Sequence, residues 1–218
     1  MLFVLMFFQG ILHGLGPDHV MAVANLSGLD RGRHVFGTGL RFGVGHSVVL
    51  VLGAGLAAVG FGAINPQMER AGERLAGILL AALGAWTLIG LVRTRAYVHT
   101  HSHHHGRHDH EHKHVHFSRL HGVEHHHPHV SSLLGGLFAL GGIRSLLLAA
   151  VPLSRAGGAL EATALVLLFA AGIVAAMTVV GVASGKLLES AGPGTRRVVV
   201  LVVGAISLAL GGAWFFLS

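Results

Sequence analysis

Apolar residues form long runs along this chain, and short polar stretches separate them. At roughly 1.5 Å of rise per residue, a helix of about 20 apolar residues crosses a hydrocarbon layer of about 30 Å. The pattern therefore predicts an all-α, polytopic membrane protein with six transmembrane helices. The predicted helices cover approximately Leu2–Leu26, Phe36–Phe61, Leu75–Val92, Ser131–Leu153, Ala162–Gly185 and Val198–Leu217.

Composition supports a membrane protein and excludes several other classes. The chain of 218 residues is 52% hydrophobic and only 11% charged, whereas soluble domains carry roughly 25% charged residues. It contains no cysteine, which excludes disulfides and thiolate metal sites. The formal net charge is +6, but the basic residues lie mainly in loops. The excess of positive charge therefore indicates orientation in a lipid bilayer, and we expect no nucleic-acid partner.

A histidine-rich stretch divides the chain into three parts. Of the nineteen histidines, all but four lie between His99 and His129. We predict a first three-helix half at 1–92, a disordered loop at 93–130 and a second three-helix half at 131–218, because the loop has too few apolar residues for a packed core. Its histidines offer many weak metal sites that would concentrate or sense ions. The alternative is a tolerated repeat expansion without a role in transport.

Basic residues also predict how the chain lies in the membrane. Most loop lysines and arginines fall between the first and second, third and fourth, and fifth and sixth runs. The other loops hold only Arg70, Arg74 and Arg155. By the positive-inside rule, the arginine-rich loops are cytoplasmic. We therefore expect a multi-pass protein of the inner or plasma membrane, with both termini outside and the histidine-rich loop in the cytoplasm.

The two halves share a faint similarity. Gly84-Ala85-Trp86 in the third run matches Gly212-Ala213-Trp214 in the sixth. Since three helices is an odd number, two such halves in tandem would have opposite orientations. This is the 3+3 inverted-repeat plan of many secondary transporters, in which the substrate site lies near the midplane.

The candidate chemistry lies in the first run, at His13-Gly-Leu-Gly-Pro17-Asp18-His19. On a regular helix the two histidines would be about 120° apart and would not converge. The glycines and Pro17 predict a break that lets them converge on an ion with Asp18. Imidazole and carboxylate suit divalent nickel, cobalt, zinc, copper or iron. The alternative is that the histidines are merely packed and Asp18 caps a half-helix, but burying all three without a function is costly.

Two further polar residues lie inside apolar runs. His46, flanked by small residues in the second run, is a plausible fourth ligand that Ser47 could orient. The predicted metal site is therefore His13, Asp18, His19 and His46. Arg144, in the fourth run, either reaches the membrane interface or serves as a counter-cation to the carboxylate when no metal is bound.

These residues carry a resemblance to a known family. His13-Gly-Leu-Gly-Pro-Asp-His19 and Phe42-Gly-Val-Gly-His-Ser-Val-Val49 resemble the His-x4-Asp-His and Leu-Gly-His-Ser-Thr-Val-Val motifs of the nickel/cobalt transporter (NiCoT) family. Leu134–Gly141 and Leu168–Gly172 are similar to the beginnings of its third and fourth motifs, although the polar residues that follow in the family are missing. Six helices and a histidine-rich loop are nearest to the RcnA-type efflux or short nickel-permease branch.

The resemblance implies a secondary carrier of nickel and/or cobalt. The metal ion would be the transported substrate, with no permanent cofactor, and protons are a plausible coupling ion. A zinc or other divalent-metal carrier and a non-transporting membrane metal-binding or sensor protein remain alternatives. We expect no enzymatic activity, because the sequence contains no His-Glu-x-x-His motif. Direct use of ATP would need a partner, since the Gly-x4-Gly-Lys-Ser/Thr motif is also missing.

Overall fold

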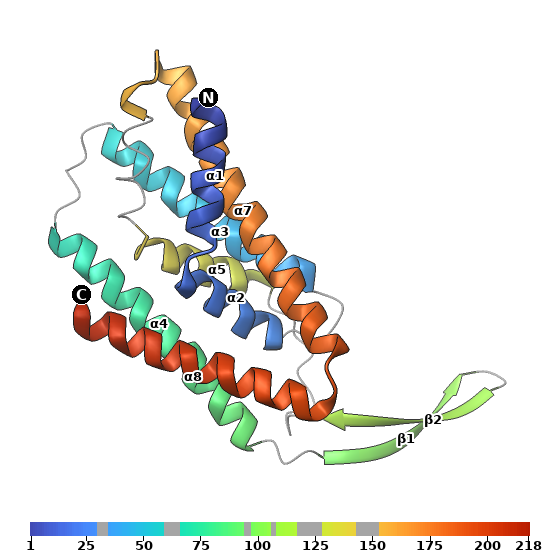
Figure 1. Ribbon diagram of the computed structural model, residues 1–218. Coiled ribbons are helices and arrows are strands. Elements are labelled where there is room, and N and C mark those ends of the chain that lie inside the picture. Colours follow the sequence, from blue (N-terminus) through green and yellow to red (C-terminus); the bar gives the residue numbers. More distant parts are fainter. Residues whose placement is uncertain (30–34, 59–65, 94–96, 106–107, 117–127, 143–152) are drawn as a thin grey trace.

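Helices make up most of the chain that the structure describes. The computed structural model describes residues 1–29, 35–58, 66–93, 97–105, 108–116, 128–142 and 153–218 (Figure 1). The helices in these segments are α1 (Leu2–Gly14), α2 (Pro17–Leu29), α3 (Val35–Ala58), α4 (Pro66–Arg93), α5 (Pro128–Ala139), α7 (Ala159–Ser190) and α8 (Pro193–Leu217).

Four of these helices are long and apolar enough to cross a membrane. They are α3, α4, α7 and α8, whose most apolar windows have a mean hydropathy between 1.4 and 2.6. Large apolar side chains such as Trp86, Leu160 and Phe216 lie exposed on them, as expected of helices that face lipid. The prediction of a helical, multi-pass membrane protein is confirmed. The count of six spans and the inverted repeat stay predictions, since α1 and α5 are shorter apolar helices.

The first apolar run is broken where the sequence predicts a break. Helix α1 ends at Gly14 and α2 begins at Pro17, and the chain changes direction between them (Figure 1). Proline lacks a backbone N–H and favours the first position of a helix. Gly16 closes the turn: its N–H donates to the His13 carbonyl at 2.9 Å, and its carbonyl accepts from the Val20 N–H at 2.9 Å.

The most extensive helix contacts each join one helix that precedes the histidine-rich strands to one that follows them. Helix α4 packs along α8, α1 packs along α7, and α3 packs against both α5 and α7. Helix α2 lies among α7, α8, α4 and α3. Within the described segments, helices of the two predicted halves therefore pack closely against one another, and the division into halves stays a prediction.

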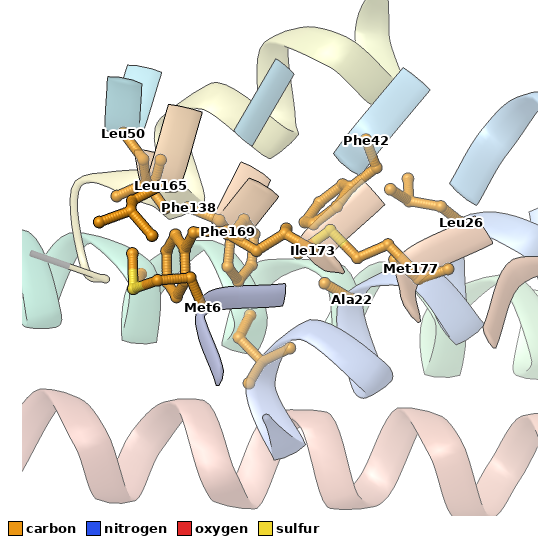
Figure 2. Close-up of a cluster of buried hydrophobic side chains, with 14 residues drawn as sticks. Met6, Ala22, Leu26, Phe42, Leu50, Phe138, Leu165, Phe169, Ile173 and Met177 are labelled. Carbon is orange, nitrogen blue, oxygen red and sulfur yellow. The ribbon is translucent and has the colours of Figure 1, made fainter. Parts of the chain in front are cut away.

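The hydrophobic core is built around one face of α7. Its buried residues Leu165, Phe169, Ile173 and Met177 recur every four positions, which is the spacing of a single helix face. They pack with core side chains of the other helices in one cluster (Figure 2). This cluster includes Met6, Ala22, Val23, Leu26, Phe42, Leu50 and Phe138. The candidate site lies beside this core.

The histidine-rich segment contains a pair of strands. Strands β1 (Tyr97–His105) and β2 (His108–His116) pair antiparallel, and the register places His99 opposite His114 and His101 opposite His112. Here histidine alternates with other residues along much of both strands, and an alternation of period two favours a strand even where apolar residues are few. Disorder without metal stays a prediction for the rest of 93–130.

Candidate metal site

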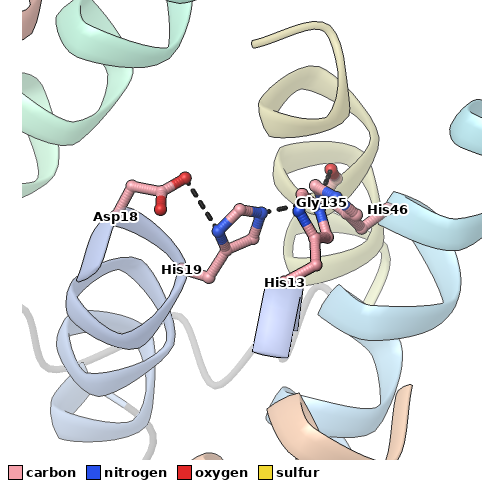
Figure 3. A network of polar contacts seen from close by, with 5 residues as sticks. All are labelled: His13, Asp18, His19, His46 and Gly135. Carbon is pink, nitrogen blue, oxygen red and sulfur yellow. Dashed lines mark hydrogen bonds and ion pairs between the residues drawn. The ribbon is translucent and has the colours of Figure 1, made fainter. Parts of the chain in front are cut away.

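The break between α1 and α2 brings His13 and His19 together, and α3 adds His46 (Figure 3). Nε2 of His46 lies 3.0 Å from Nε2 of His13 and 3.3 Å from Nε2 of His19. One ring nitrogen from each histidine lies within 4.8 Å of those of the other two. Three imidazoles, one from each of three helices, therefore direct ring nitrogen atoms into one small volume.

The separations between these nitrogen atoms match those of ligands that share one ion. With metal–nitrogen bonds of about 2.1 Å, two ligands are about 3.0 Å apart at a 90° angle and about 3.4 Å apart at a tetrahedral angle. The observed 3.0 and 3.3 Å lie at these two values.

Hydrogen-bond partners on the far side of two rings determine which nitrogen atom is free. Nδ1 of His19 lies 2.8 Å from Oδ2 of Asp18, and Nδ1 of His46 lies 3.2 Å from the carbonyl oxygen of Gly135. The carbonyl oxygen of Gly135 can only accept, so Nδ1–H of His46 donates to it. Nε2 of His46 then carries a lone pair toward the centre of the cluster, as in histidines that ligate metals. Nδ1 of His19 faces the Asp18 carboxylate at ion-pair distance, which leaves its Nε2 on the side of the cluster.

The structure places Asp18 behind the imidazoles and not among them. The predicted site held Asp18 as a ligand, but in this arrangement its carboxylate contacts His19, and the group of three converging ligand residues contains only His13, His19 and His46. Asp18 lies in the first turn of α2, where the helix dipole favours a negative charge. From there it orients His19 and supplies a negative charge near the cluster.

Burial and aromatic rings enclose the cluster. His46 is 0% exposed and His19 is 3% exposed, while His13 is only partly buried. The Phe42 ring stacks on His46 at a centroid distance of 6.3 Å, and Phe169 lies 5.8 Å from the His13 ring. The surroundings are therefore apolar, and charge–dipole interactions within them are stronger than in water.

Glycines let the backbone approach the rings closely. A Cβ atom on Gly16 would lie 2.8 Å from Oδ1 of Asp18 and 3.1 Å from Nδ1 of His19. A Cβ atom on Gly135 would collide with the Phe42 carbonyl, so only glycine lets α5 approach α3 and offer its carbonyl to His46. A larger residue at position 135 would therefore push α5 away from α3, and one at position 16 would crowd the side chains of Asp18 and His19.

Sequence reasoning missed the role of Gly135 and assigned the orientation of His46 to Ser47. The Ser47 hydroxyl donates instead to the Ala170 carbonyl at 3.3 Å. The pair Gly135-Gly136 in an apolar run was a signal of close helix contact, but it did not identify the partner helix. Arg144, for which the sequence left a place at the membrane interface or a role as counter-cation open, lies outside the described residues.

Long apolar helices and three converging imidazoles define a polytopic membrane protein with a candidate transition-metal site. The comparisons with known proteins agree with this class. A family described as "NicO: High-affinity nickel-transport protein" matches residues 1–213. The chain belongs to this family, which confirms the resemblance to nickel and cobalt transporters.

A cobalt transport protein, NhlF of Rhodococcus rhodochrous, is 34% identical over 91 residues. The match covers 41% of this chain and 26% of that protein, so the chain matches about a quarter of the relative's length. No solved structure shows a significant match.

Proposed function

We propose that this protein carries nickel and/or cobalt ions across a membrane, with His13, His19 and His46 as the ligands of the ion in transit. The observation that carries the proposal is the convergence of three Nε2 atoms at 3.0 and 3.3 Å in a buried site. Membership of a nickel-transport family supports it, as does the similarity of one segment to a cobalt transport protein.

The chemistry of the cluster suits a substrate that must bind and leave. Neutral imidazoles replace water around nickel and cobalt without closing the coordination shell, because three ligands leave positions for water. Asp18 offsets part of the charge of the ion in an apolar setting. Since histidines bind metal only in the neutral form, metal and protons compete, and proton exchange is a suitable coupling reaction for a secondary carrier.

The orientation of the chain completes the proposal. Both termini face outward and the histidine-rich segment faces the cytoplasm, since the loops with most arginine and lysine lie on that side. Metal bound by this segment would raise the local concentration at the cytoplasmic mouth. This arrangement fits efflux.

A zinc carrier is the second candidate. The separation of 3.3 Å between Nε2 of His19 and Nε2 of His46 is close to the tetrahedral value, and three histidines with an open fourth position are a known zinc arrangement. The flux assay described next distinguishes the two candidates by which ion is transported fastest.

The test is metal flux into liposomes that contain only this protein, with nickel, cobalt, zinc and manganese compared. We expect nickel and cobalt to exceed the other ions, and His19→Ala and His46→Ala to lower the flux by at least about tenfold. His129→Ala, at an exposed histidine outside the cluster, is the matched control and should transport normally. No flux above that of empty liposomes would refute transport, and binding without flux would favour a sensor.

A further inference from the structure

A second buried polar cluster lies further along α2. The Asn25 amide nitrogen donates to the Ser207 hydroxyl of α8 at 2.7 Å, and its amide oxygen accepts from the Thr87 hydroxyl of α4 at 2.8 Å. The same nitrogen also donates to the Met21 carbonyl at 2.8 Å. One side chain of α2 is therefore hydrogen-bonded to two other helices at once.

These groups are enclosed by the protein. Asn25 is 2% exposed, Ser207 is 0% exposed and Thr87 is 8% exposed. The Ser207 hydroxyl in turn donates to the Val203 carbonyl at 2.7 Å. In apolar surroundings a polar group that loses its partner finds no water to replace it, so these three side chains hold α2, α4 and α8 together in one arrangement.

Helices α4 and α8 are built to behave as one body. Glycines bring their backbones into contact: a Cβ atom on Gly84 would lie 2.6 Å from the Gly204 carbonyl oxygen, and a Cβ atom on Gly211 would collide with the backbone nitrogen of Ala81. No other pair of described helices has a more extensive contact. The remaining helices α1, α3, α5 and α7 pack mainly with one another.

Helix α2 contacts both the α4·α8 pair and the group formed by α1, α3, α5 and α7. At its first turn it carries Asp18 and His19, and the break at Gly16-Pro17 separates it from α1. Asn25 lies six residues after His19, or about 9 Å along the axis. A short helix with a break at one end can turn as a rigid rod. A rotation of α2 that moves His19 must then either break the Asn25 hydrogen bonds or move the α4·α8 pair.

We propose that Asn25, Thr87 and Ser207 form a coupling junction, through which metal binding at the histidine cluster repositions the α4·α8 pair. The three are positioning residues, since they act on the ion through α2. The inference rests on the proposed function for its transport readout. In this proposal the two predicted halves do not move as units. The boundary of motion runs instead between the α4·α8 pair and the other helices.

The first test compares Thr87→Val with Thr87→Ser. Valine has nearly the shape of threonine but no hydroxyl, and serine keeps the hydroxyl that donates to Asn25. We expect Thr87→Val to lower the maximal rate of nickel flux by about tenfold, within the usual range of coupling between sites. Equilibrium nickel binding should stay within about twofold of the unmodified protein for both variants, and Thr87→Ser should transport normally. Equal flux for the two variants would overturn the proposal.

The second test needs no transport. The two tryptophans of the chain, Trp86 and Trp214, lie on α4 and α8, so tryptophan emission reports on this pair. We expect zinc or nickel to shift the emission maximum in the unmodified protein and in Thr87→Ser, but not in Thr87→Val. His19→Ala is the control. Its histidine-rich segment still binds metal but its cluster does not, so we expect no emission shift.

The outcomes separate this inference from the proposed function. Flux in the unmodified protein without an emission shift overturns the coupling and leaves transport standing. An emission shift without flux supports the coupling and refutes transport. If Thr87→Val yields no folded protein, Ser207→Ala, which removes the hydrogen bond on α8, takes its place with the same expected loss of flux and of the shift.

Discussion

The replacement Asp18→Asn tests whether this carboxylate acts through His19. The distance between Oδ2 of Asp18 and Nδ1 of His19 is 2.8 Å. Adding an imidazole and a metal–nitrogen bond of about 2.1 Å places the carboxylate roughly 7 Å from the ion. At an effective dielectric constant of 20, a unit negative charge attracts a dication at this distance by about 5 kcal/mol, which is an upper bound.

The expected loss is smaller than this bound. Asparagine keeps the size of the side chain and an oxygen that can accept from His19, so the orientation of the ring is retained and only the charge is lost. Replacing a partner of a metal-ligating histidine lowers metal affinity by about 10–100-fold, or about 1.4–2.8 kcal/mol. We expect Asp18→Asn near the lower value and Asp18→Ala, which also removes the acceptor, near the higher one.

The assay is calorimetric titration of purified protein with nickel, after deletion of His99–His129 to remove background binding. Glu189→Gln, at an exposed carboxylate of α7, is the matched control and should bind as the parent does. A loss above about a thousandfold for Asp18→Asn would show that Asp18 ligates the ion directly, as the sequence pattern predicts. Unchanged affinity would refute the electrostatic reasoning.

Further predictions concern the glycines, the histidine-rich segment and Arg144. Gly16→Ala should lower nickel affinity by about tenfold in the same titration, because its Cβ would lie 2.8 Å from Oδ1 of Asp18; parent-like affinity would contradict the close packing there. Gly135→Ala should destabilise the protein by about 1–3 kcal/mol in thermal unfolding, since α5 must move away from α3, and an unchanged unfolding temperature would refute the contact. Deletion of His99–His129 should change the concentration dependence of metal flux while some transport remains, whereas identical saturation curves would assign the segment no role. Arg144→Ala should alter nickel flux if Arg144 is a counter-cation, and unchanged flux at normal protein levels would refute that role.

Efflux and uptake are distinguished by flux measurements on vesicles of known orientation. Flux measured separately in right-side-out and inside-out vesicles assigns the direction. We expect faster flux in inside-out vesicles, where the histidine-rich segment faces the metal.

Local sequence was sufficient for the features that depend on one segment. The apolar runs predicted membrane helices because hydrophobic length alone decides whether a helix can span. Gly16-Pro17 predicted the break because proline cannot continue the hydrogen-bond ladder of a helix. His13, His19 and His46 were singled out as candidate ligands because imidazoles inside apolar runs are costly without a function.

Tertiary structure decided everything that depends on which helix faces meet. In a helix that is apolar on all sides, the sequence does not distinguish the face toward lipid from the face toward protein. For that reason the pairing of α4 with α8, the role of the Gly135 carbonyl and the contacts of Asn25 with Thr87 and Ser207 could not be predicted. The same limit explains Asp18: its type and position marked it as part of the site, but only the fold placed it behind His19.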